Sequence, residues 1–150
     1  MYPKYSYDYY GYINNYLNMK YQICTTEEQS KRLIEIGFKK ETADMKIDLY
    51  YPDEPSITPT DVDIDWSKQD EFVPAWSLTA LLEMLPKAIR YNDLIHYLEI
   101  QTDEECYDFE YHIFDGEREW YLSGGYDANI FEAIIETFEM LIEKELYKID

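Results

Sequence analysis

Three aspartates stand two residues apart in the stretch DVDIDW, and this spacing is the strongest hint of metal chemistry in the chain. Asp61, Asp63 and Asp65 match the first, third and fifth positions of a calcium-binding loop. Such a loop also needs glycine at position 6 and glutamate at position 12. Trp66 and Phe72 stand there instead. We therefore expect no metal ligands in this stretch, and no cofactor anywhere in the chain.

The same stretch is the candidate contact for a partner protein. Val62, Ile64 and Trp66 alternate with the aspartates, which predicts a short edge strand with an acidic, solvent-facing side. Prolines and negative charges dominate residues 51–73, which predicts a long surface connection. The candidate partner-binding residues are Asp61, Asp63, Asp65, Asp70 and Glu71.

The charge of the whole chain limits its partners. The sequence has 13 Lys and Arg against 32 Asp and Glu, a net charge of −19. Binding to a nucleic-acid backbone depends on basic residues, so we expect no direct nucleic-acid binding. A basic protein would be attracted instead. The leading hypothesis is a non-enzymatic binding or accessory protein, such as an inhibitor or immunity-like protein that imitates nucleic acid. Excess charge that serves solubility alone stays open.

Few residues suggest catalysis. The chain has no GxGxxG, GxSxG or HExxH motif. His96 and His112 are predicted on opposite faces of a sheet, so they cannot share one metal or acid–base site. We expect His96 to be a core histidine bonded to a tyrosine or a carbonyl. No catalytic residue is predicted, and an enzyme whose site combines distant carboxylates with His96 is kept as an alternative.

A glycine pair raises the question of an anion site. Gly124 and Gly125 follow a predicted strand and precede a predicted helix, as in loops that cradle phosphate. No basic residue follows within reach, and Asp127 would repel a phosphate. We therefore expect a strand-to-helix turn.

Capping residues and apolar spacing predict the helices. The first begins at a capping box, either Thr25 with Glu28 or Thr26 with Gln29, and Gly37 closes it. A central helix over residues 77–85 begins at Ser77 and is stopped by Pro86. Its apolar face comprises Leu78, Leu81, Leu82 and Leu85.

The C-terminal helix is expected from near Asp127 to about Leu146, with Asp127 as its cap. Its predicted buried stripe comprises Phe131, Ile134, Ile135, Phe138, Leu141 and Ile142.

Alternating apolar residues predict strands at residues 94–100, 107–114 and 118–123, and a further strand over residues 43–50. The apolar pattern sets Leu98 opposite Phe109, and a turn at Asp115–Gly116 sets Tyr111 opposite Trp120. The fold is thus α+β: an antiparallel sheet of three or more strands, a meander over residues 94–123, carries helices on one face. The central and C-terminal helices are expected to cover Tyr111, Trp120, Phe109 and Leu98.

The N-terminal residues 1–21 form a separate, Tyr-rich arm with eight of the 17 tyrosines. We expect a single α+β domain over residues 22–150. Tyrosine offers large contact area at low entropic cost, so the arm supports a second alternative, a homo-oligomeric structural protein.

The cysteines and the absence of long apolar runs predict a location. Cys24 and Cys106 belong to no CxxC motif, which is typical of a reducing compartment. The N-terminus lacks the apolar region of a secretory signal, and no apolar run approaches the length of a membrane span. We therefore expect a cytoplasmic protein that does not associate with membranes.

Three stretches together resemble a family of small uncharacterised proteins from bacterial genomes and their prophages or mobile elements. They cover about a third of the chain, and they read EQSKRLIEIGFKKETADM from Glu28, PAWSLTALLEMLP from Pro74 and NIFEAIIETFEMLIEKELYK from Asn129. The resemblance implies a cytosolic accessory protein encoded on mobile DNA. The family has no established activity, so the resemblance implies no site residue.

Overall fold

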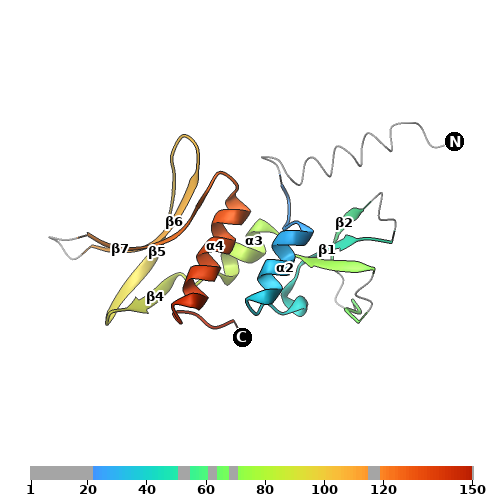
Figure 1. Ribbon diagram of the computed structural model, residues 1–150, viewed down its shortest axis with the longest axis horizontal. Coiled ribbons are helices and arrows are strands. Elements are labelled where there is room, and N and C mark those ends of the chain that lie inside the picture. Colours follow the sequence, from blue (N-terminus) through green and yellow to red (C-terminus); the bar gives the residue numbers. More distant parts are fainter. Residues whose placement is uncertain (1–21, 51–54, 61–63, 68–70, 115–118, 150) are drawn as a thin grey trace. The chain divides into compact units, whose positions relative to one another are not determined.

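The computed structural model describes residues 22–50, 55–60, 64–67, 71–114 and 119–149 (Figure 1). Helices and two antiparallel sheets make up these residues, which confirms the predicted α+β class. Contacts divide the chain into two compact units, Met1–Ala80 and Leu81–Asp150, which we call unit 1 and unit 2. The single domain over residues 22–150 stays a prediction, and the Tyr-rich arm lies outside the described residues.

Helix α2, Glu27–Glu35, begins at one of the two capping boxes that the sequence allows. The Thr26 hydroxyl accepts a hydrogen bond from the Gln29 N–H at 3.2 Å. The Gln29 side-chain oxygen accepts one from the Thr26 N–H at 3.0 Å. Both otherwise unpaired donors are thereby satisfied.

The end of α2 is the predicted glycine. Gly37 has a φ of 112°, a conformation that other residues rarely adopt. The Gly37 N–H donates to the Ile34 carbonyl at 3.0 Å, and the Phe38 N–H donates to the Leu33 carbonyl at 2.9 Å. These two bonds form a Schellman motif. A 3-10 turn, η1 (Lys40–Thr42), leads into the first sheet.

Unit 1 contains a three-stranded antiparallel sheet in the order β2-β1-β3. The strands are β1 (Met45–Asp48), β2 (Ser56–Pro59) and β3 (Phe72–Ala75). The predicted alternation over residues 43–50 is confirmed, because Ile47 is buried against Cys24 and Ala75. The partly buried residues around this cluster are Met45, Leu49, Ile57 and Val73.

The long surface connection predicted over residues 51–73 is wrong in part, because it supplies β2 and the first half of β3. Each strand is short and contributes one apolar partner to Ile47, Ile57 from β2 and Val73 from β3. Such strands are too short to show an alternation. Pro59 and Pro74 are tolerated because both strands lie at the edges of the sheet.

Helix α3, Leu78–Met84, matches the predicted central helix and crosses the boundary between the units. The Ser77 hydroxyl accepts a bond from the Ala80 N–H at 3.2 Å, which confirms Ser77 as the N-cap. Asp44 in turn accepts bonds from the Ser77 N–H, at 2.8 Å, and from its hydroxyl. Leu81 and Leu85 are buried, as their spacing predicts.

Unit 2 contains a four-stranded antiparallel sheet in the order β4-β5-β6-β7. Its strands are β4 (Ala88–Tyr91), β5 (Leu94–Thr102), β6 (Tyr107–Phe114) and β7 (Glu119–Asp127). The predicted meander is therefore confirmed, and β4 is an addition to it. Asn92 and Asp93, with φ of 49° and 64°, form the two-residue turn between β4 and β5.

The strand registers differ from the predicted ones by two residues. Leu98 lies opposite Tyr111 rather than Phe109. Tyr111 lies opposite Leu122 rather than Trp120, and Phe114 lies opposite Glu119. A shift of two keeps every side chain on its predicted face, so the apolar pattern could not distinguish the registers. The predicted turn at residues 115 and 116 lies outside the described residues.

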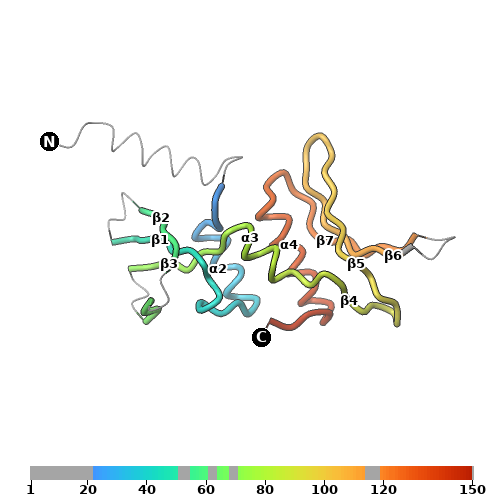
Figure 2. The backbone as a smooth tube through the Cα atoms, turned by 180° about the vertical axis from the view of Figure 1, so that it is seen from behind, coloured from blue at the N-terminus to red at the C-terminus, as the bar shows by residue number. Residues whose placement is uncertain are grey.

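Helix α4, Ile130–Glu143, packs on β6 and β7, and both views show it alongside β7 (Figures 1 and 2). Asn129 caps the helix by accepting from the Phe131 N–H at 2.9 Å. The predicted cap, Asp127, is instead the last residue of β7 and accepts from the Asn129 N–H at 2.7 Å. The predicted apolar stripe is buried except for Ile142, which is half-buried.

The central and C-terminal helices were expected to cover four side chains of the sheet. This expectation is correct for Phe109 and Tyr111, which are fully buried, and wrong for Trp120. Trp120 shares their face but is 47% exposed, and Leu98 is half-buried. The helix lies against β7 at Gly124 and Gly125, several residues beyond Trp120.

Helix α4 also ends in a Schellman motif, but Glu145 occupies the left-handed position with a φ of 56°. A side chain costs about 1 kcal/mol in this conformation, and negative charge is unfavourable at a helix C-terminus. We expect Glu145→Gly to raise the free energy of unfolding, measured by urea denaturation, by about 0.5–1 kcal/mol. Gly37→Ala should lower it by a similar amount. A less stable Glu145→Gly variant would contradict this account.

Candidate functional site

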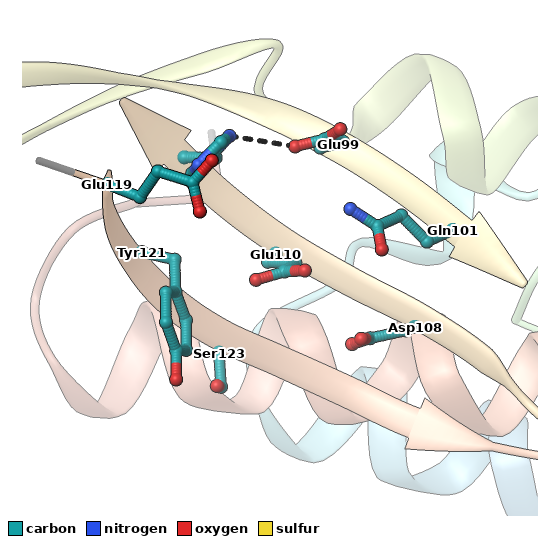
Figure 3. Close-up of a pocket in the computed structure, with 8 residues that line it drawn as sticks. Glu99, Gln101, Asp108, Glu110, Glu119, Tyr121 and Ser123 are labelled. Carbon is teal, nitrogen blue, oxygen red and sulfur yellow. Dashed lines mark ion pairs between the residues drawn. The ribbon is translucent and has the colours of Figure 1, made fainter. Parts of the chain in front are cut away.

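The face of the second sheet that points away from α4 carries a polar hollow of about 560 Å³. We call it the outer-face hollow. Its side chains come from β5, β6 and β7, because successive residues of a strand point to opposite faces (Figure 3). The lining residues are Glu99, Gln101, Asp108, Glu110, His112, Glu119, Tyr121 and Ser123.

Strand pairing arranges these residues in two rows across the sheet. In one row, His112 lies between Tyr97 and Tyr121. Both tyrosines are well exposed, at 60% and 65%. In the next row, Glu110 lies between Glu99 and Ser123. An aromatic row thus runs beside an acidic row.

The carboxylates of the hollow repel one another. Partial burial is the main cause that raises the pKa of Glu110, and repulsion from Asp108 and Glu99 raises it further. Glu119 adds to the increase, whereas His112 opposes it. The His112 Nδ1 lies 2.9 Å from the Glu99 Oε2, so this ring can offset part of the negative charge when it is protonated. None of the lining residues that the structure describes is Lys or Arg.

The raised pKa of Glu110 predicts a pH-dependent gain from Glu110→Gln. The folded state holds the Glu110 proton more tightly than the unfolded state, so stability falls as pH rises above the ordinary value of 4.5. At pH 7 glutamine removes the repulsion, and we expect a gain below about 1 kcal/mol because the carboxyl is largely exposed.

The gain should disappear by about pH 3, where Glu110 is protonated and resembles glutamine. Thermal unfolding at both pH values measures it, with Glu104→Gln in the exposed β5–β6 connection as the control. An equal gain at both pH values would rule out charge repulsion as its cause.

The hollow can bind cationic groups, but the described residues offer little for other chemistry. No group of three or more His, Cys, Asp or Glu among them could hold a metal ion. Burial, with repulsion from Asp44, raises the pKa of the Cys24 thiol to about 12, so this thiol is a poor nucleophile. Cys24 and Cys106 are both free.

The predicted partner-binding residues lie in unit 1, apart from the hollow in the sequence. Asp61, Asp63 and Asp70 lie outside the described residues. Asp65 is exposed and accepts a bond from the Ser67 N–H at 2.9 Å, so residues 64–67 form a turn rather than the expected edge strand. Glu71 accepts a bond from the Leu49 N–H through its carbonyl, at 2.8 Å. A role for these residues in partner binding stays a prediction.

The two histidines occupy opposite faces of the sheet, as the sequence predicts. His96 is buried, with Nδ1 3.3 Å from the Leu94 carbonyl and its ring edge-on to Tyr91. It lies opposite Ile89 of β4. The hollow contains His112 instead, so His96 cannot act together with the hollow's carboxylates.

Gly124 and Gly125 form neither the predicted turn nor an anion cradle, because both lie within β7. The Gly125 N–H donates to the Thr137 hydroxyl of α4 at 2.8 Å. The pair therefore serves the contact between strand and helix.

Sequence reasoning missed the hollow because acidic residues are abundant throughout the chain. The usable signal is positional: acidic and polar residues recur at every second position in β5, β6 and β7. Only the true register shows which of them meet.

Comparison with protein-family models, curated proteins and solved structures found no match. Within the described part of the chain, every helix is too short or too polar to span a membrane.

Proposed function

We propose that this protein is a binding protein that receives a basic partner protein in the outer-face hollow. The observation that supports the proposal is the convergence of four carboxylates from three strands, with no Lys or Arg among the described residues that line the hollow. These carboxylates belong to Glu99, Asp108, Glu110 and Glu119. The net charge of −19 has the same sign, so it would steer a basic partner toward the protein.

The chemistry of the two rows suits arginine and lysine side chains. Exposed carboxylates can pair with a guanidinium in bidentate fashion. Tyr97 and Tyr121 present aromatic rings beside them, on which a guanidinium can stack. Burial is the larger cause of the raised pKa of Glu110, and a bound cation would relieve the repulsion from Asp108 and Glu99 that adds to it.

The resemblance described above suggests the biological setting. Under this proposal the chain is a cytoplasmic, non-enzymatic accessory protein of a bacterium or its mobile DNA. An acidic surface that holds a basic protein is typical of inhibitors and immunity proteins that imitate nucleic acid.

A titration with a basic peptide tests the proposal. The peptide acetyl-TRVKVRVKT-amide, added to the full chain in a calorimeter at low salt, should bind in a salt-dependent manner. Neutralising three carboxylates together, by Glu99→Gln, Glu110→Gln and Glu119→Gln, should weaken binding about tenfold. The hollow variant should also show a shallower dependence on salt.

The control is a second triple variant that loses the same three negative charges in unit 1, away from the hollow in the sequence. Glu28, Glu35 and Glu41 are exposed in unit 1, and their replacement by glutamine should weaken binding less than about threefold. Equal losses in the two triple variants would show that net charge alone attracts the peptide. The proposal would then be wrong.

A further inference from the structure

We propose that the basic partner binds as an extended segment that adds a strand to the open edge of β7. This inference rests on the proposed function and specifies the conformation of the partner. Strand β7 is the last strand of its sheet, and its other edge pairs with no described strand. Such an edge presents backbone N–H and C=O groups that a further strand can satisfy.

The pairing of β7 with β6 leaves alternate backbone groups of β7 facing outward. Antiparallel strands bond through alternate residues. The edge residues that share the outer face are Glu119, Tyr121 and Ser123. All three are exposed, and their side chains line the hollow, as Figure 3 shows. A strand added here would therefore lie directly beside the acidic surface.

The far end of the same edge is already closed by α4. The Gly125 N–H donates to the Thr137 hydroxyl at 2.8 Å, and the Tyr126 N–H donates to the Glu136 carboxylate at 3.1 Å. The available edge is thus residues 119–123. This length suits a short segment rather than a whole sheet.

The two faces of the sheet favour different side chains in the added strand. Residues of the added strand on the outer face would lie beside Glu119, with Glu110 one strand further away, which favours Arg or Lys. Residues on the other face would lie beside Trp120, which is 47% exposed. Burial of its ring favours apolar partners there. The expected pattern is basic and apolar residues in alternation.

A second copy of this chain fits the edge poorly. Two β7 strands paired edge to edge would bring two acidic hollows together, and like charges across strands are destabilising. The net charge of −19 adds repulsion. The edge therefore favours a basic partner over self-association.

Backbone methylation of the peptide tests strand addition. Two forms of acetyl-TRVKVRVKT-amide carry N-methyl groups either on the Arg and Lys residues or on the Val residues, so both keep the full charge. In an added strand only one set of amides faces β7. We expect one form to bind at least about tenfold more weakly than the other in a calorimetric titration with the full chain.

Each result decides a different point. Two methylated forms of equal affinity would overturn strand addition, whereas the proposed function would survive if both still bind. Failure of the unmethylated peptide to bind would overturn the proposed function itself. Light scattering would detect self-association as a dimer mass. If Ser123→Pro abolishes that dimer, the edge serves self-association and the inference is overturned.

Variants of the edge give an independent check. Successive N–H groups of a strand point to opposite edges, so either Leu122→Pro or Ser123→Pro removes an N–H from the open edge, whereas Leu122→Ala and Ser123→Ala remove none. Where circular dichroism shows that the variants fold, one proline variant should bind the peptide at least about fivefold more weakly than its alanine counterpart. Equal affinities would count against strand addition.

Discussion

Replacing Gly125 with alanine is expected to lower the free energy of unfolding of unit 2 by at least about 3 kcal/mol. A Cβ at this position would lie 1.8 Å from the Ala133 carbonyl oxygen and 2.6 Å from its carbon. Both are backbone atoms of α4, so no side-chain rotation can relieve the clash. The helix would have to move away from β7, which would uncover its apolar stripe.

Two neighbouring substitutions provide controls for this experiment. A Cβ at Gly124 would lie 2.7 Å from the Phe109 carbonyl oxygen and 2.8 Å from the Thr137 hydroxyl, so Gly124→Ala should cost less, about 1–3 kcal/mol. Ser123→Ala, at an exposed position, should change little. Urea denaturation followed by far-UV circular dichroism measures all three. A Gly125→Ala protein as stable as the wild type would show that α4 does not lie against β7.

Replacing Trp76 with alanine is expected to cost about 3–5 kcal/mol in unit 1. The indole is fully buried and meets the Phe38 ring edge-on, with centroids 5.5 Å apart. Its N–H donates to the Thr42 hydroxyl at 3.0 Å. The backbone of Trp76 is held as well, because its N–H donates to the Thr25 hydroxyl at 3.0 Å. The Trp76 side chain, directly after β3, is thus held against Phe38 and Thr42 in the segment that follows α2.

A matched tryptophan in the same chain makes this test specific. Trp120 is 47% exposed, so Trp120→Ala should cost less than about 1 kcal/mol. Trp76→Phe should fall between the two, because it keeps a ring beside Phe38 and loses the bond to Thr42. Denaturation curves that rank the variants differently would refute the packing described for unit 1.

The helix boundaries could be predicted where they depend on local chemistry. Thr26 and Ser77 cap helices through bonds to amides three residues away, and Gly37 ends one through its backbone conformation. These signals need only a few neighbouring residues. The cap of α4 was misplaced because Asp127 and Asn129 are both good caps, and only the end of β7 decides between them.

The sheet register could not be predicted, because apolar alternation repeats every two residues. The predicted and observed registers bury the same faces, so both satisfy the pattern. The difference matters for the site. The predicted register places Glu99 opposite Asp108, whereas in the structure Glu99 lies opposite Glu110. Either register sets a carboxylate opposite Glu99, but only the observed register shows that its partner is Glu110.

Two strands of the first sheet, β2 and β3, could not be predicted for a different reason. Strands β2 and β3 have four residues each and contain proline, so they resemble a loop in the sequence. Their pairing with β1 depends on contacts with Ile47 from segments before and after it. Tertiary contacts rather than local propensity define these strands.

The most direct test of the account is a map of where a basic peptide binds. Adding acetyl-TRVKVRVKT-amide to the isotopically labelled full chain should shift the backbone amide signals of β7 and of the hollow most strongly. The residues expected to shift include Glu110, His112, Tyr121 and Ser123. Shifts concentrated instead at Asp65 and Glu71, or spread evenly over both units, would contradict the outer-face hollow as the binding surface.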